Sequence, residues 1–170
     1  ELLKVKFLKY SKIASPVGDV LLVWNSTGLT QISFQQGCKV IDASPTWEQC
    51  TEPDFDADVQ LTAYFKGTLT DFDLPLAPEG TDFQRQVWKE LASVPFGETI
   101  SYSGLAARLG KPAASRAIGA ANARNPLPVV VPCHRIVGIN GNLTGYSAGL
   151  AIKKFLLEHE CHQAFRMNSP

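Results

Sequence analysis

At residues 129–138 the sequence reads Val129-Val130-Val131-Pro132-Cys133-His134-Arg135-Ile136-Val137-Gly138. Three β-branched residues in a row predict a buried strand, and Pro132, which lacks an amide N–H, is expected to end the pairing of that strand. Cys133 would then lie at the end of a strand, followed directly by a histidine and an arginine. We interpret the segment as the site of a reactive thiol.

The residues beside the cysteine support this interpretation. A thiol attacks only as the thiolate, and a nearby imidazole from His134 and a cation such as Arg135 would lower its pKa. Because side chains alternate along an extended chain, His134 could reach the sulfur only if the backbone turns there or a water bridges the two groups. The alternative is a buried cysteine that acts as a small apolar residue. The crowding of Pro132, His134 and Arg135 around Cys133 favours the reactive site.

The composition is typical of a globular protein. The chain has 170 residues and is 45% hydrophobic, which is enough for a core in one domain or in two small ones. No apolar run is long enough to cross a bilayer, and no basic and apolar leader opens the sequence, so we expect a soluble, intracellular protein. No CxxC pair or zinc-like spacing occurs, so we expect free thiols at Cys38, Cys50, Cys133 and Cys161.

The formal net charge of zero hides an asymmetry along the chain. Residues 1–81 carry 6 Lys and Arg against 11 Asp and Glu, whereas residues 82–170 carry 10 against 5. Residues 99–157 contain no carboxylate but have seven cations: Arg108, Lys111, Arg116, Arg124, Arg135, Lys153 and Lys154. This pattern favours a surface that faces a polyanion such as nucleic acid, with a solvated basic face as the simpler alternative.

The first half is predicted to be a small α/β unit. Strands are expected at residues 5–8, 19–24 and 29–34, with turns at 15–18 and 25–28. Residues 45–53 are expected to be irregular, and the apolar positions after Asp56 predict a helix that Gly67 ends. The acidic residues are scattered and suggest no chemistry. We expect residues 1–76 to form a supporting domain.

The second half, residues 82–170, is predicted to be mostly helical and to follow a linker at residues 77–81. Thr81 and Gln84 form a capping box for a helix that ends at residues 95–97. Ser103 is expected to cap a short helix that stops at Gly110, and a second helix follows at residues 113–123. Two short helices around a glycine-containing turn are typical of a helix-turn-helix, although a simple helical hairpin is the alternative. The small residues of the second helix favour close approach to DNA over base reading.

The end of the chain is predicted to add a hairpin and a last helix. Asn140-Gly141 is a strong hairpin signal and suggests a wing beside the helix pair. Ser147 is expected to cap a helix that ends near residues 158–160. Because acids at a helix C-terminus oppose the helix dipole, at least one of Glu158 and Glu160 should have another role, with a solvated helix end as the alternative for Glu158.

The segment Pro132-Cys133-His134-Arg135 resembles the signature of the O6-alkylguanine-DNA alkyltransferases, or methylated-DNA-protein-cysteine methyltransferases, of the bacterial single-chain type. The resemblance continues in the family's order through residues 83–88, 101–102, 115–119, 125–126, 145–147 and 156–160. It implies an α/β N-terminal domain of ribonuclease-H-like topology and a mostly α C-terminal domain with a winged helix-turn-helix. It also implies direct-reversal DNA repair by a suicide enzyme, which transfers an alkyl group irreversibly from O6-alkylguanine, and also from O4-alkylthymine, to its own cysteine.

The resemblance further implies roles for single residues. Cys133 would accept the alkyl group. His134 would keep Cys133 as the thiolate through a bridging water, and Glu160 would orient the His134 ring. Tyr102 would help to rotate the phosphate and donate a proton to the departing guanine, and Asn125 would brace the turn behind the cysteine. For Tyr102 a place in the core, and for Asn125 a simple turn role, remain alternatives.

The same resemblance assigns two surfaces. Arg116 would take the place of the extruded nucleotide in the duplex. The full set of expected DNA contacts is Arg116, Tyr102, Ser103, Ala117, Ala121, Asn122, Arg124 and Arg135. The expected substrate pocket consists of Val131, Pro132, Ile136, Tyr146, Ser147 and Ala148, where Tyr146 could instead be a core aromatic. Ala148 stands where relatives often have glycine, which would narrow the pocket for bulky alkyl groups.

The expected partner is double-stranded DNA that contains O6-alkylguanine. The first half lacks the Cys and His cluster that binds zinc in some members, so we expect no metal and no cofactor. We expect no membrane contact and a monomer, with clustering on DNA as an alternative, in the cytoplasm and on the nucleoid of a bacterium. Two other functions remain open: a non-catalytic protein that binds alkyl lesions, which Cys133 argues against, and a cysteine hydrolase, which would leave the basic span unexplained.

Overall fold

The N-terminal half is a four-stranded sheet covered by one helix. The computed structural model describes residues 7–169, with strands β1 (Lys9–Ile13), β2 (Val20–Asn25), β3 (Gly28–Phe34) and β4 (Glu48–Gln49) and helix α1 (Ala57–Phe65). The strand order is β3-β2-β1-β4, antiparallel except for the parallel pair β1 and β4. The predicted second and third strands and the helix are confirmed, as is the turn before Gly18, whose N–H donates to the Ser15 carbonyl.

Two predictions for this half were wrong. The first strand begins at Lys9 and not within residues 5–8, of which Leu8 lies outside any strand and residues 5 and 6 fall outside the described residues. Its sequence is mostly polar, so pairing with β2 rather than apolar alternation decides its place. The segment expected to be irregular contains β4, which pairs with Lys9 and Tyr10 of β1.

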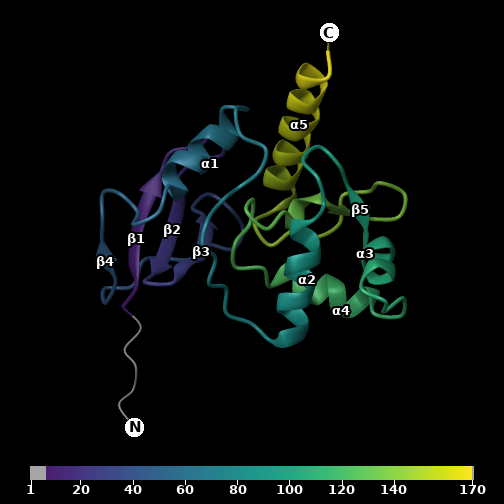
Figure 1. The fold of residues 1–170 in the computed structure, drawn as a ribbon, viewed down its shortest axis with the longest axis horizontal. Coiled ribbons are helices and arrows are strands. Elements are labelled where there is room, and N and C mark those ends of the chain that lie inside the picture. The colour runs from purple at the N-terminus through teal and green to yellow at the C-terminus, as the bar shows by residue number, and fades with distance from the viewer. Residues whose placement is uncertain (1–6, 170) are drawn as a thin grey trace.

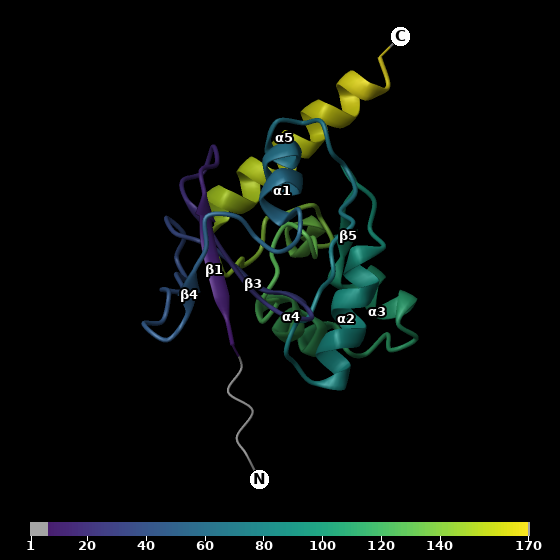
Figure 2. The same ribbon diagram turned by 60° about the vertical axis from the view of Figure 1, so that its left-hand side comes forward.

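The C-terminal half is a group of helices around the cysteine segment. It contains α2 (Asp82–Ala92), β5 (Ile100–Ser101), α3 (Tyr102–Arg108), α4 (Ser115–Ala123), the 3-10 turn η1 (Cys133–Arg135), β6 (Ile136–Val137) and α5 (Leu150–Met167). Figures 1 and 2 show the sheet on one side of the molecule, α2, α3 and α4 on the other, and α5 reaching beyond the body toward the C-terminus. The capping box is confirmed: the Thr81 side chain accepts from the Gln84 N–H, and Gln84 accepts from the Thr81 N–H.

The caps of two helices differ from the prediction. Ser101, and not Ser103, caps α3 by accepting from the Gly104 N–H at 3.0 Å. Helix α5 is preceded by Gly149, at φ +104°, and not by Ser147. This helix continues to Met167, so Glu160 lies within it and the argument from the helix dipole does not apply. A backbone conformation that favours glycine, rather than a side-chain cap, sets the start of α5.

The cysteine segment is turned rather than extended. Residues 129–131 form no strand, because Val129 has φ +76° and the Val131 N–H donates back to the Leu127 carbonyl. Cys133 therefore opens the turn η1 instead of ending a strand. The Asn140-Gly141 turn is present, with Gly141 at φ +76°, but β6 pairs in parallel with β5 and not with a hairpin partner. The wing is a loop.

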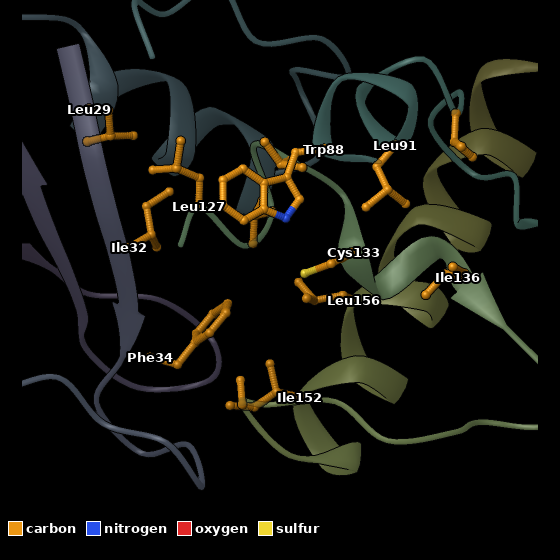
Figure 3. Packing of buried hydrophobic residues seen from close by; sticks show 14 of the residues in the cluster. Leu29, Ile32, Phe34, Trp88, Leu91, Leu127, Cys133, Ile136, Ile152 and Leu156 are labelled. Carbon is orange, nitrogen blue, oxygen red and sulfur yellow. The ribbon is translucent and has the colours of Figure 1, made fainter. Parts of the chain in front are cut away.

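One hydrophobic core joins the two halves. Figure 3 shows Leu29, Ile32 and Phe34 of β3 facing side chains of α2 and α5, with Cys133 close to Leu156 and Trp88. The linker strengthens this union, because the Leu29 N–H donates to the Pro75 carbonyl and the Ala77 N–H to the Leu29 carbonyl, both at 2.8 Å. Cys133 thus belongs to a core that both halves build. None of the helices within residues 7–169 has the length and apolar character needed to span a membrane.

Replacing Gly28 with alanine should weaken the attachment of the linker. Gly28 has φ +153°, and a Cβ there would press on the Pro75 carbonyl group. We expect Gly28→Ala to lower the free energy of unfolding by about 2 kcal/mol, measured by urea denaturation. Gly141→Ala is the control, since Gly141 has φ +76° but no atom within 4 Å of the added Cβ. Equal losses in the two variants would show that contact with the linker contributes nothing.

Candidate active site

A tied turn presents the cysteine. Asn125 donates from Nδ2 to the Val131 carbonyl at 2.9 Å and accepts the Leu127 N–H on Oδ1 at 3.0 Å. These bonds enclose Val129, a β-branched residue with positive φ, a conformation that costs roughly 1–3 kcal/mol and persists only where the surroundings impose it. Asn125 thus lies at the turn behind the cysteine, where the family resemblance places it.

The Cys133 sulfur lies in an apolar environment. The residue is only 2% exposed, and its thiol donates to the Tyr146 hydroxyl across 3.8 Å. Burial raises the pKa of the Cys133 thiol, although the Asn125 amide, the Tyr146 hydroxyl and the Lys153 ammonium favour the thiolate. The predicted lowering of the Cys133 pKa is thus outweighed by burial, and the net shift is upward. The cation that acts on the sulfur is Lys153.

His134 and Glu160 form a buried pair directly behind the cysteine. Nε2 of His134 lies 2.6 Å from Oε1 of Glu160. Burial by itself would raise the pKa of Glu160, but His134 and Arg135 outweigh it and lower this pKa to about 2. Burial lowers the pKa of His134, so the neutral imidazole donates from Nε2 to the ionised carboxylate. Nδ1 of His134 is buried without a hydrogen-bond partner among the described residues and is left with a free lone pair.

Glu160 is held by groups from three other parts of the chain. Arg135 donates to both carboxylate oxygens at 2.9 Å, and the Gly97 N–H donates to Oε2 at 3.2 Å. The Tyr64 hydroxyl of α1 donates a hydrogen bond to Oε1 of Glu160 at 2.8 Å. Burial and the Glu160 charge raise the pKa of Tyr64 well above its usual value, so the phenol stays a donor. The N-terminal half, expected only to support, therefore contributes directly to this network.

Arg135 lies in the interior and not on a surface that DNA could contact. It is 5% exposed, its guanidinium is shared between Glu160 and the Val94 carbonyl, and it lies 5.8 Å from the Phe96 ring centroid. A buried carboxylate requires such a partner, which is why the cation turns inward. We therefore assign Arg135 to the buried network and not to the expected DNA contacts.

Sequence reasoning missed Lys153 and Thr144. Lys153 appeared to be one of two adjacent surface lysines, but it is fully buried, and its Nζ donates to the Thr144 carbonyl at 3.0 Å. Burial lowers the pKa of Lys153, which the Cys133 charge opposes. The helical spacing of Lys153, Leu156 and Glu160 places all three on one face of α5, and this spacing was the available signal. Thr144 Oγ1 also pairs with the Tyr102 hydroxyl at 3.0 Å.

The helix pair α3 and α4 presents some of the expected DNA contacts outward. Ser103, Arg116, Ala117 and Arg124 are exposed, and Tyr102 is half-buried. Ala121 and Asn122 point inward, where Asn122 donates to the Cys133 carbonyl at 3.4 Å. Of the seven cations in the acid-free span, five are exposed: Arg108, Lys111, Arg116, Arg124 and Lys154. The exposed side of this half keeps its basic character.

Of the expected pocket residues, Tyr146 contacts the thiol directly. Val131, Pro132 and Ile136 are buried next to Cys133 in the chain, and Tyr146 and Ser147 are half-buried. Ala148 is buried, and its carbonyl accepts the Cys38 N–H at 3.1 Å. Ser147 and Ala148 also line a cleft with Ile32 and Phe34 of β3. Within residues 7–169, no cluster of three or more His, Cys, Asp or Glu residues could hold a metal ion.

Family models cover nearly the whole chain. Residues 8–78 match the "6-O-methylguanine DNA methyltransferase, ribonuclease-like domain", and residues 82–162 match the "6-O-methylguanine DNA methyltransferase, DNA binding domain". These two matches, with the solved structures below, confirm the predicted fold class of an α/β first half and a mostly helical, DNA-binding second half.

Relatives and solved structures agree with these models. The methylated-DNA–protein-cysteine methyltransferase of Methanosarcina acetivorans is 48% identical over 151 residues, which cover 89% of this chain and 97% of that protein. The Mycobacterium tuberculosis protein of the same name is 42% identical over 158 residues, covering 92% and 94%. The crystal structure of M. tuberculosis OGT in complex with DNA has a TM-score of 0.84 at 41% identity, covering 91% of this chain and 94% of that one.

Removing the Tyr64 hydroxyl should weaken the network from the N-terminal side. Tyr64→Phe keeps the ring but deletes a buried hydrogen bond to an ionised carboxylate, so we expect the free energy of unfolding to fall by about 1.5–3 kcal/mol. Urea denaturation at neutral pH measures this loss. Tyr10→Phe is the control, since the Tyr10 ring packs near Trp47 and its hydroxyl has no hydrogen bond among the described residues. Similar stabilities for the two variants would contradict the assigned contribution.

Proposed function

The chain belongs to the 6-O-methylguanine DNA methyltransferases, or methylated-DNA–protein-cysteine methyltransferases, and we propose that it repairs O6-alkylguanine in duplex DNA by transferring the alkyl group to Cys133. The observation that carries the proposal is the Cys133 thiol on the η1 turn, backed by the 2.6 Å pair of His134 and Glu160. This pair follows an exposed basic helix pair in the same domain. The buried thiol site without the basic helix pair, or the helix pair without the thiol site, would not support alkyl transfer from DNA.

The transfer is a single displacement at carbon. The Cys133 proton passes through a bridging water to Nδ1 of His134, and Glu160 stabilises the imidazolium that results. The sulfur then forms a bond to the alkyl carbon as the bond from that carbon to O6 of guanine breaks. Tyr102 donates a proton to the departing guanine, which leaves as a neutral base. No group of the site can break the new thioether, so each molecule acts once.

The geometry requires the base to leave the helix. A thiol that is 2% exposed cannot reach an alkyl group inside a stacked duplex, so the nucleotide must swing out at a cost of a few kcal/mol. Arg116 is exposed in the first turn of α4 and is suited to fill the vacated position. The DNA backbone around this vacated position would be contacted by Ser103, Ala117 and Arg124. Tyr146, Ser147 and Ala148 would enclose the extruded base.

Several broader features belong to the same proposal. Residues 1–76 and 82–170 would act as two domains joined at 77–81, which the ends of the two family matches support. The protein would act as a monomer on duplex DNA in the cytoplasm, at the nucleoid of a bacterial cell. O4-alkylthymine would be a second substrate. A lesion-binding protein without transfer, or a cysteine hydrolase with turnover, are the competing outcomes of the following test.

Incubation with an O6-methylguanine duplex should add one methyl group to each protein molecule. Mass spectrometry should locate the methyl on the Cys133 peptide, because this sulfur has both a base and a stabilising cation. Cys133→Ala should bind the duplex but gain no methyl, while Cys161→Ala, which changes an exposed thiol, should be methylated. Binding without transfer would favour a lesion reader, and repeated product release would favour a hydrolase.

Arg116→Ala should separate base extrusion from chemistry. If Arg116 offsets part of the cost of flipping, its loss should slow repair in duplex DNA about tenfold or more. Transfer from free O6-methylguanine base, which needs no extrusion, should stay near the wild-type rate. Arg108→Ala removes another exposed cation and should reduce duplex repair much less. An equal loss on duplex and free base would exclude the filling role of Arg116.

A further inference from the structure

We propose that Thr144 is a positioning residue for proton donation by Tyr102. Its hydroxyl donates a hydrogen bond to the Tyr102 oxygen while the phenolic proton moves to the departing guanine. The inference rests on the proposed function, in which guanine needs that proton to leave as a neutral base. It adds a second hydroxyl to the proton-donating side of the site.

The first observation is the direct contact between the two hydroxyl groups. Tyr102 is the first residue of α3, and its phenolic oxygen lies 3.0 Å from Thr144 Oγ1. Both residues are half-buried, and Thr144 lies two residues before Tyr146, whose hydroxyl contacts the Cys133 sulfur. Thr144 therefore links Tyr102 to the chain segment that contacts the thiol through Tyr146.

The second observation is that Thr144 is itself held in place. The Lys153 ammonium, fully buried on α5, donates to the Thr144 carbonyl at 3.0 Å. A hydrogen bond from an ionised donor is about twice as strong as a neutral one, so the loop is firmly attached at this residue. The Thr144 methyl group also lies near Gly138, since a Cβ added to that glycine would be 3.5 Å from it. The Lys153 bond therefore holds the Thr144 backbone at the place from which its hydroxyl meets the Tyr102 oxygen.

The chemistry gives this hydroxyl a task. When Tyr102 gives its proton to guanine, the phenolic O–H bond breaks, an N–H bond forms on the base, and negative charge develops on the phenolic oxygen. A preorganised O–H donor aimed at developing charge lowers the barrier more than solvent does, because it needs no reorganisation. Thr144 keeps its own proton throughout. Tyr102 recovers its proton from solvent after guanine departs.

Two methyl donors with different leaving groups test the assignment. Guanine must be protonated to leave, whereas the iodide of methyl iodide leaves without a proton. Single-turnover methylation of Cys133 is followed by mass spectrometry in the full chain, with a saturating O6-methylguanine duplex or with methyl iodide. The variants are Thr144→Val, which has a similar shape without the hydroxyl, and Thr144→Ser, which keeps it.

The expected result is a loss confined to the guanine donor. Thr144→Val should slow transfer from the duplex about tenfold to a hundredfold, the effect of losing one hydrogen bond to a charged group, and leave the methyl iodide rate within about twofold. Thr144→Ser should restore most of the duplex rate. In a Tyr102→Phe background, which has no phenolic proton, Thr144→Val should cause no further loss.

Other results would overturn the inference. A Thr144→Val protein that repairs the duplex at the wild-type rate would exclude any role for the hydroxyl. An equal loss with both donors would mean that Thr144 acts only through the general structure of the site. A further loss in the Tyr102→Phe background would show that it does not act through Tyr102. Failure of the proposed function is distinct, since wild-type protein would then take no methyl from the duplex at all.

Discussion

The structure depends on one buried negative charge, the carboxylate of Glu160. Removing an ion from water costs several kcal/mol unless its hydrogen bonds are replaced in full. Here the replacements come from α1 through Tyr64, from the loop between α2 and β5 through Gly97, and from η1 through His134 and Arg135. The same bonds that make the charge tolerable therefore join the two halves of the chain. They also hold the His134 ring in place.

The site combines a protected nucleophile with nearby groups that can activate it. Burial raises the pKa of Cys133 and so favours the thiol, and the residue belongs to a hydrophobic cluster with members from both halves. The Asn125 amide, the Tyr146 hydroxyl and the buried Lys153 ammonium oppose this effect by favouring the thiolate. A sulfur arranged in this way meets few reagents from solvent. An alkylated guanine that entered the pocket would meet the Cys133 sulfur beside the groups that favour its thiolate.

The acid-free span illustrates how composition and structure share the explanation. Five of its seven cations are exposed on the DNA-binding half, which suits a polyanionic partner. The other two, Arg135 and Lys153, turn inward and serve Glu160, Thr144 and the thiol. Charge counting could not separate the groups, since an interior cation differs from a surface one only in the partners that tertiary packing provides.

Local chemistry in the sequence determined the capping box at Thr81, the apolar strands β2 and β3, the helix that Gly67 ends, and the family signature around Cys133. Each depends on residues close together in the chain. Only the tertiary structure decided that residues 129–131 turn, that α5 continues past Glu160, and that Tyr64 and Lys153 enter the site. These features depend on contacts between residues far apart in sequence, and a buried charge or a strained Val129 is stable only when such contacts form together.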